Sequence, residues 1–167
     1  MALLLIGLLA AASPAWAAQH VAAPSIEQLT RAADVVAIGE VVSATGEWAP
    51  GRATIQTRVV LAVVELLKGT ELSPLTFTHL GGRVGDEASA IGGGPQLQPG
   101  GRVVVFLTRR QDGSLRLRDL TYGKFGIVRD AATGRDHALL ATGATGADRI
   151  DLDQLRRLVR RAQEGTN

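Results

Sequence analysis

The sequence predicts a mainly β protein, built as a small barrel with a short helix before it and a longer helix after it. Segments rich in Val, Ile and Leu recur about every dozen residues from residue 34 onward, and Gly, Pro or Asp separate them. Helical periodicity is confined to residues 25–32 and to the chain after residue 151. Short strands with helices only at the ends are typical of a small barrel or sandwich.

The amino-terminal helix and the first strand follow each other directly. Ser25 opens a helix expected over residues 25–32, and Gln28 stands where a capping box requires it. The first strand is expected over residues 34–45, which are rich in Val and Ile. Gly39 in the middle of this strand predicts a bulge or a sharp bend.

The second strand is expected over residues 54–67, after a turn at residues 47–51. Its apolar residues keep to one face at the amino end and occupy both faces from Val60 onward. This pattern fits a bent strand that serves both sides of a barrel. The third strand is expected over residues 75–80.

A glycine-rich stretch and two further strands come next. Residues 81–101 are expected to form an irregular loop, and a loop of this length in a compact domain is usually functional or disordered. Residues 102–108 have the continuous apolar run of a buried strand. Residues 112–113 are a hairpin turn that leads to a strand over residues 114–118. Together these strands favour a five-stranded OB-like barrel.

Two weaker strands and a helix complete the chain. Strand patterns are present at residues 122–128 and, more weakly, at residues 137–141. Asp151 can cap an amphipathic helix. We therefore expect an OB-like barrel domain over residues 25–145 and a C-terminal amphipathic helix over residues 146–167.

Residues 1–17 are interpreted as a signal peptide. They carry no charged side chain, are apolar over residues 2–12 and end in the A-x-A cleavage pattern at residues 15–17. A retained membrane anchor is the alternative, because no Lys or Arg precedes the apolar run. Cleavage would leave residues 18–24 as a flexible amino-terminal segment of a secreted or periplasmic protein that has no membrane contact.

Composition excludes several kinds of site. The chain has no cysteine, so an exported domain would be held by packing alone and could have neither a thiolate metal site nor a Cys nucleophile. The formal net charge of +2 does not indicate a nucleic-acid partner. Four arginines form a basic band on the last helix, but no aromatic series accompanies them. We interpret the band as a solvated face and predict no nucleic-acid binding.

Several short motifs resemble a known family. Residues 33–36 (Ala-Asp-Val-Val), followed by a long strand that ends in Leu-Lys-Gly at residues 67–69, resemble the amino-terminal domain of tissue inhibitors of metalloproteases and netrin-like modules. Residues 99–107 are similar to the fourth strand of that family. The resemblance implies an OB-fold barrel and a secreted protein partner such as a metalloprotease. The cysteine that chelates the protease zinc in that family is missing here, so only the fold is carried over.

The chain is more similar to uncharacterised secreted bacterial proteins of the same style. In those proteins a Gly-Gly-x-x-Gly segment, a Gly-x-Pro segment and a Gly-Lys-Phe segment recur in the order seen here at residues 81–85, 93–95 and 123–125. The candidate binding residues are Gly81, Gly82, Arg83, Gly85, Pro95, Lys124 and Phe125.

Lys124 has two interpretations. Lysine is rare in this chain, and this one lies between Tyr122 and Phe125, so it can mark a binding surface. It can also be the exposed position of an alternating strand whose Phe125 and Ile127 point inward. The second interpretation is favoured.

Histidine offers two further candidates. If cleavage follows Ala17, His20 is the third residue of the mature chain and completes a planar nitrogen set that suits Cu(II) or Ni(II), although an incidental tail histidine is favoured. His79 is favoured as a core or edge residue of the third strand. A hydrolase that uses His79 with Asp86 or Glu87 is kept as an alternative.

No nucleophile elbow, phosphate-binding loop or zinc motif is present in the sequence. We therefore expect a non-catalytic binding module without a cofactor. Its partner is expected to be a secreted protein, engaged through the amino terminus and residues 81–101. A structural role in the cell envelope is the second alternative.

Overall fold

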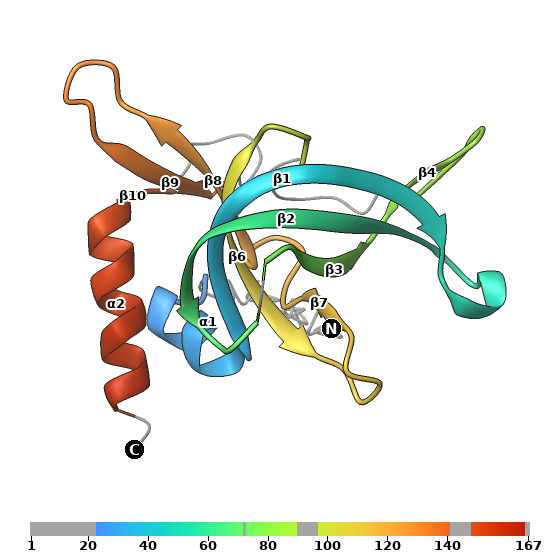
Figure 1. Cartoon of the computed structure of the whole chain (residues 1–167), viewed down its shortest axis with the longest axis horizontal. Helices are drawn as coiled ribbons and strands as arrows, with labels where there is room; N and C mark the ends of the chain where they lie inside the picture. Colours follow the sequence, from blue (N-terminus) through green and yellow to red (C-terminus); the bar gives the residue numbers. More distant parts are fainter. Residues whose placement is uncertain (1–22, 72, 90–96, 141–147, 166–167) are drawn as a thin grey trace, which may run out of the picture.

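The computed structural model describes residues 23–71, 73–89, 97–140 and 148–165 of the chain (Figure 1). The expected signal peptide, His20 and Pro95 lie outside these residues. The described residues form a closed barrel, a sheet that continues beyond it, two α-helices and a short 3₁₀ helix, η1 (Pro50–Arg52).

The barrel consists of the five strands that the sequence predicts. They are β1 (Val35–Trp48), β2 (Ile55–Lys68), β3 (Leu75–Leu80), β6 (Arg102–Arg109) and β7 (Leu115–Leu117). The order is β1-β2-β3-β7-β6, and pairing of β6 with β1 closes the ring. Only β3 and β7 run parallel; the other neighbours are antiparallel. The predicted five-stranded OB-like barrel is therefore confirmed.

Gly39 marks the bend of β1, as the sequence predicts. The register between β1 and β2 shifts between Ile38 and Gly39. A Cβ atom at Gly39 would lie 2.5 Å from the carbonyl oxygen of Ala62, so no larger residue fits here without a shift of the backbone. The bend lets one long strand pair with β6 through Val35–Glu40 and with β2 along its length.

Beyond β6 the sheet continues outside the barrel. Its order is β6-β8-β9-β10, with β8 (Lys124–Arg129), β9 (Asp136–Leu140) and β10 (Asp148–Asp151). β10 is not expected from the sequence, because its charged residues lack the alternation of a half-buried strand. Pairing with β9 determines its conformation.

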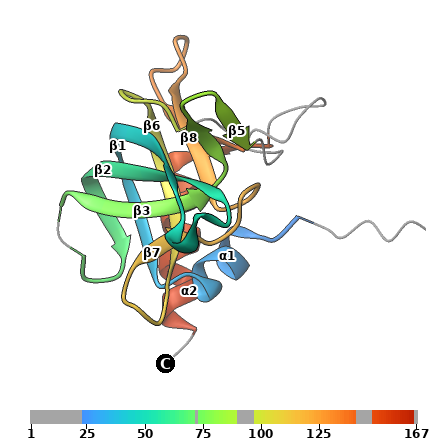
Figure 2. The ribbon, with the colours of Figure 1, turned by 90° about the vertical axis from the view of Figure 1, so that its right-hand side faces the viewer.

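The two helices lie against each other beside the barrel (Figure 2). α1 (Ile26–Ala32) begins with the expected capping box, in which the Ser25 hydroxyl accepts from the Gln28 amide at 3.2 Å. α2 (Leu152–Glu164) is capped by the Asp151 side chain. The helix thus fills only part of the segment 146–167 assigned to it, because β10 precedes it. No helix among the described residues has the length and apolar character that crossing a bilayer requires.

β1 and β6 separate two hydrophobic cores. Along β6, Val103, Val105 and Leu107 point into the barrel, whereas Val104 and Phe106 point toward the helices. The barrel core also includes residues of β2, β3 and β7, and the helix-side core includes residues of α1, α2, β8 and β9. Both faces of β6 are therefore buried, which explains its continuous apolar run.

The glycine-rich stretch after β3 is more ordered than the sequence indicates. β4 (Gly82–Val84) and β5 (Glu87–Ser89) form a two-stranded hairpin within the segment expected to be an irregular loop. Strands of three residues are too short to show a period in the sequence. The hairpin lies against β1 at Gly46, where any Cβ atom would overlap the backbone of Arg83.

Candidate functional site

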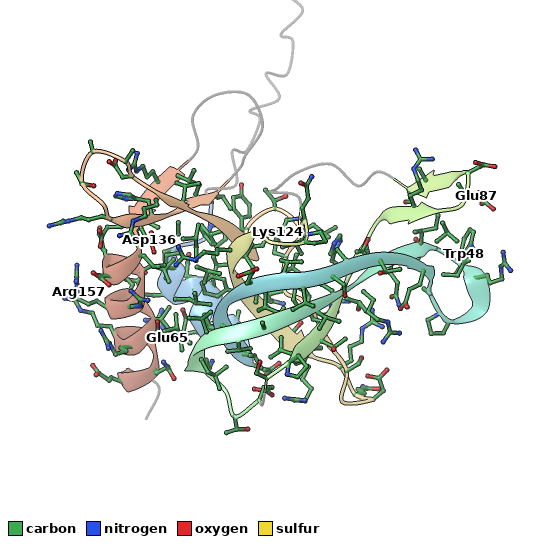
Figure 3. All side chains as sticks on the ribbon, turned by 45° about the horizontal axis from the view of Figure 1, so that its top comes forward. Trp48, Glu65, Glu87, Lys124, Asp136 and Arg157 are labelled. Atoms are coloured by element: carbon green, nitrogen blue, oxygen red, sulfur yellow. The ribbon has the colours of Figure 1, made fainter. Side chains whose placement is uncertain are left out.

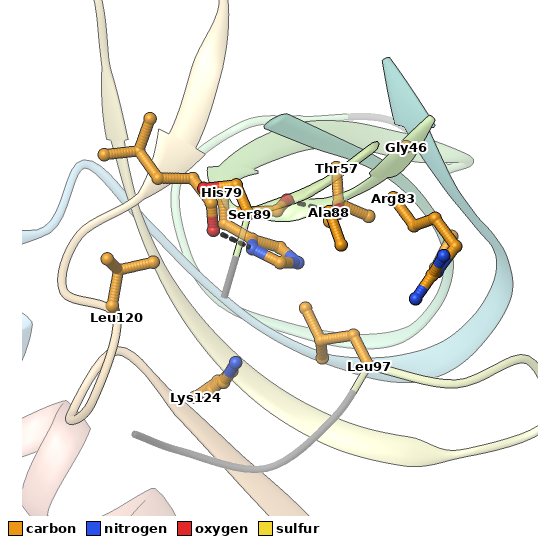
Figure 4. Close-up of a pocket in the computed structure, with 13 residues that line it drawn as sticks. Gly46, Thr57, His79, Arg83, Ala88, Ser89, Leu97, Leu120 and Lys124 are labelled. Atoms are coloured by element: carbon orange, nitrogen blue, oxygen red, sulfur yellow. Dashed lines mark hydrogen bonds between the residues drawn. The ribbon is translucent and has the colours of Figure 1, made fainter. Parts of the chain in front are cut away.

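A cavity of about 490 Å³ opens at the end of the barrel beside the β4–β5 hairpin (Figure 4). We call it the barrel-mouth cavity. The side chains that matter for its chemistry come from β2, β3, β4, β5, the approach to β6, and β8; they are Thr57, His79, Arg83, Ser89, Leu97 and Lys124. Its volume lies within the range of small-ligand sites, and the mouth of a barrel is a common place for them.

Lys124 points into this cavity because of its position in the sheet. It lies opposite Val105 in the register of β8 and β6, and Val105 belongs to the barrel core. Directly opposed residues of antiparallel strands point to the same face, so Lys124 is turned toward the barrel interior. Its exposed fraction is only 5%. The favoured prediction of a solvent-exposed Lys124 is therefore wrong.

The side chain of Lys124 is largely buried, and its ammonium group faces the barrel-mouth cavity (Figure 4). None of the described residues forms a hydrogen bond or an ion pair with it. Burial lowers the pKa of Lys124 below its ordinary value of 10.5. A buried cation of this kind is uncommon unless it is paired.

His79 lies across the same cavity. It is opposite Thr57 in the register of β3 and β2, and both side chains are on the barrel-interior face. Its Nδ1 is 2.9 Å from the carbonyl oxygen of Leu80. Burial lowers the pKa of His79 below 6.5; the hydrogen bond to Leu80 opposes this shift, and the charge of Lys124 adds to it.

Three of the predicted glycine-segment residues border the cavity. Gly81, Gly82 and Arg83 line it, and the Thr57 hydroxyl donates to the Gly81 carbonyl at 2.7 Å. Gly82 has φ +143°, and a Cβ atom there would lie 2.5 Å from the Thr57 hydroxyl oxygen. A glycine is therefore required where β4 turns over the rim.

The other predicted binding residues do not border the cavity. Gly85 is in the hairpin turn, and Pro95 is outside the described residues. Phe125 points to the opposite face of β8, where its ring packs edge-on against Phe106 with 5.9 Å between the centroids. The structure thus joins Lys124 with Gly81–Arg83 and places Phe125 in the helix-side core.

The residues of the hydrolase alternative are not gathered together. Asp86 and Glu87 are exposed at the tip of the β4–β5 hairpin, and neither lines the barrel-mouth cavity. Figure 3 shows Glu87 at the far end of the hairpin, away from Lys124. Within the part of the chain that the structure describes, no three His, Asp or Glu residues are grouped to hold a metal ion.

Comparison with known proteins does not assign this chain to a family. Neither a protein-family model nor a curated protein matches this sequence. The resemblance to metalloprotease inhibitors therefore stays a prediction, and the function has to be inferred from the barrel-mouth cavity itself.

The chemistry of the cavity favours an anionic ligand. A lysine, an arginine and a histidine line it, and none of the described lining residues is acidic. Thr57, Ser89 and Leu97 are also in its wall, although sequence reasoning did not select them. Thr57 could have been found from the alternation of β2, which places it on the inward face with Ile55 and Val59.

Proposed function

We propose that this protein is a non-catalytic binding module that takes an anionic group of its ligand, a carboxylate, into the barrel-mouth cavity. The observation that carries the proposal is the burial of Lys124 at the mouth of the barrel without a partner among the described residues. The carboxylate would supply the counter-ion that the described residues do not provide.

The energetics of a buried charge support this assignment. An unpaired ammonium in a poorly solvated place destabilises the folded protein, and a ligand carboxylate at hydrogen-bond distance removes much of that penalty. Charge-assisted hydrogen bonds are among the stronger polar contacts in proteins. The open side of the cavity allows the ligand to enter after folding, so the free protein bears the cost and the complex recovers it.

Binding is favoured over hydrolysis by the surroundings of His79. A histidine base is usually oriented by a carboxylate, and Asp86 and Glu87 lie on the hairpin tip instead. Ser89 also lines the cavity, but no hydrogen bond to His79 is present among the described residues.

The compartment and the partner class complete the proposal. The apolar residues 1–17 support export, and an exported binding module would meet a secreted protein that supplies the carboxylate. Identifying that protein as a metalloprotease rests on the resemblance alone. An accessory role in the cell envelope is compatible with the same cavity.

The two lysines of the chain allow a direct test. Reductive ¹³C-methylation keeps the charge of lysine and labels only Lys68, Lys124 and the amino terminus. The probe is the peptide acetyl-Gly-Glu-Gly-amide, with acetyl-Gly-Gln-Gly-amide as its uncharged control. We expect the Glu peptide to shift the Lys124 signal and to leave the Lys68 signal in place.

A variant and its control complete the test. K124M should abolish binding of the Glu peptide, whereas R157Q, an equal loss of charge on the exposed face of α2, should not. The proposal is contradicted if the Lys124 signal does not shift when the Glu peptide is added, or if K124M still binds that peptide.

A further inference from the structure

A second cavity, of about 230 Å³, adjoins the barrel-mouth cavity. The two share His79, Leu80 and Leu120 in their walls. We call the second one the rim cavity; its charged lining residues are Arg110, Arg116, Arg118 and Asp119. The two cavities therefore adjoin at these three residues.

The rim cavity forms where β3 and β7 part. These strands pair only through Phe77 with Leu115 and Thr78 with Arg116. The residues that follow β7, Arg118 to Leu120, line the rim cavity together with His79 and Leu80 of β3. Arg116 is exposed because it alternates with the buried residues Leu115 and Leu117 along β7.

The charges around the rim cavity are mainly positive. Arg116 and Arg118 form no ion pair with any residue that the structure describes. Hydrogen bonds from Ser114 lower the pKa of Asp112, and the charge of Arg110 adds to this shift. Asp119 is the one described carboxylate in the lining, and its Oδ1 already accepts hydrogen bonds from the amides of Thr121 and Tyr122, each at 2.8 Å.

We infer that the two cavities together hold one acidic polypeptide segment, with one carboxylate at Lys124 and a second carboxylate at Arg116 and Arg118. The inference rests on the proposed function, because Lys124 is the first of the two contacts. A guanidinium group matches a carboxylate with paired hydrogen bonds, so the arginines give the second position geometric selectivity as well as charge.

The hairpin edge favours a polypeptide over an anionic polysaccharide. Among the described strands, β5 pairs with β4 alone, and its residues Ala88 and Ser89 line the barrel-mouth cavity. An unpaired strand edge offers backbone amides and carbonyls in the spacing of an extended peptide. The apolar walls at Leu80 and Leu120 suit the aliphatic stem of a Glu side chain.

The inference is tested with fluorescent peptides that carry one or two Glu residues. The two-Glu peptides have one, two or three Gly residues between the acids, and each has a partner in which the second Glu is replaced by Gln. Binding is measured by fluorescence anisotropy at low salt. We expect one of the two-Glu peptides to bind about tenfold or more tightly than its Gln partner.

The double variant R116Q/R118Q should lose this gain and keep the affinity for a one-Glu peptide. R157Q/R160Q, with the same loss of charge on α2, should behave as the unaltered protein. Equal affinity for one-Glu and two-Glu peptides, a gain that survives in R116Q/R118Q, or an oligogalacturonate that shows the same arginine-dependent gain would overturn the inference. Failure of the proposed function looks different, because K124M would then leave one-Glu binding unchanged.

Discussion

Lys124 lies directly opposite Val105 in the register of β8 and β6, and this pairing turns a cation toward the barrel interior. The other lysine of the chain has a different environment. The Nζ of Lys68 donates to the carbonyl oxygens of Thr30, at 2.8 Å, and Ala33, at 2.6 Å, at the carboxyl end of α1. One lysine thus has two hydrogen-bond acceptors and the other has none among the described residues, so their removal should act on stability in opposite directions.

Replacing Lys124 with Met should stabilise the free protein. Met keeps a side chain of similar length and removes the partly desolvated ammonium, whose charged form burial disfavours. Urea unfolding at neutral pH should therefore give K124M a higher free energy of unfolding than the unaltered protein has.

The advantage of K124M should depend on pH. The folded-state pKa of Lys124 is below 10.5, so between that pKa and 10.5 the unfolded chain holds a proton that the folded chain has released. The stability of the unaltered protein then rises with pH across this window, and the gap to K124M narrows as pH approaches 10.5. A gap of constant size, or a K124M variant that is less stable, would show that the ammonium has a stabilising partner in the free protein.

Replacing Lys68 with Met should destabilise the protein. The substitution removes both hydrogen bonds to the end of α1 and leaves its carbonyls to water. A hydrogen bond from a charged group contributes about 1.5 to 3 kcal/mol, and partial exposure places the expected loss near the lower figure. The same urea titration measures it, with K124M as the matched lysine-to-methionine control. A Lys68 variant as stable as the unaltered protein would contradict the prediction.

Acid should weaken the fold through His79. Its folded-state pKa is below 6.5, so as pH falls through 6.5 the unfolded chain gains a proton that the folded chain does not take up. The free energy of unfolding should therefore fall between pH 6.5 and the folded-state pKa. In H79Q this decline should be shallower, which thermal melts over a pH series can measure. In the unaltered protein, ¹H NMR of the His79 ring should give a titration midpoint below pH 6.5. A titration midpoint above pH 6.5 would show that the pKa of His79 is not lowered in the folded protein.

Gly46 should not tolerate alanine. A Cβ atom there overlaps the backbone of Arg83, so G46A has to push the β4–β5 hairpin away from β1. Overpacking of this kind costs about 1 to 3 kcal/mol. G126A is the control, because Gly126 is also in a strand and has no atom near its Cβ position. Equal stability of the two variants would mean that the hairpin moves freely. The Lys124 signal of the NMR test should also respond less to the Glu peptide in G46A, because the hairpin forms one wall of the cavity.

Much of the fold follows from local signals in the sequence. The capping box at Ser25 and the bulge at Gly39 depend on side chains and backbone within a few residues, and both are confirmed. The five barrel strands have apolar runs bounded by turn residues. β4, β5 and β10 were missed because they are short or charged, and pairing with a neighbouring strand determines their conformation.

The candidate site was only half predictable. The sequence drew attention to Lys124 and to residues 81–83, which the structure brings to one cavity. The exposure of Lys124 was predicted incorrectly, because the alternation rule assumes that one face of a strand meets solvent. At its first residues β8 passes the barrel mouth instead, so Lys124 points into the barrel-mouth cavity and Phe125 into the helix-side core. Only the register with β6 reveals this, and register is a long-range property.

The two-sided burial of β6 has a consequence for cooperativity. Its residues alternate between the barrel core and the helix-side core, so neither core can open without loosening the strand that the other needs. Barrel and helices should therefore melt in a single transition, and the amides of β6 should exchange with solvent only through global unfolding. A ligand bound at the barrel mouth would then slow hydrogen exchange in α2, a helix that it never touches.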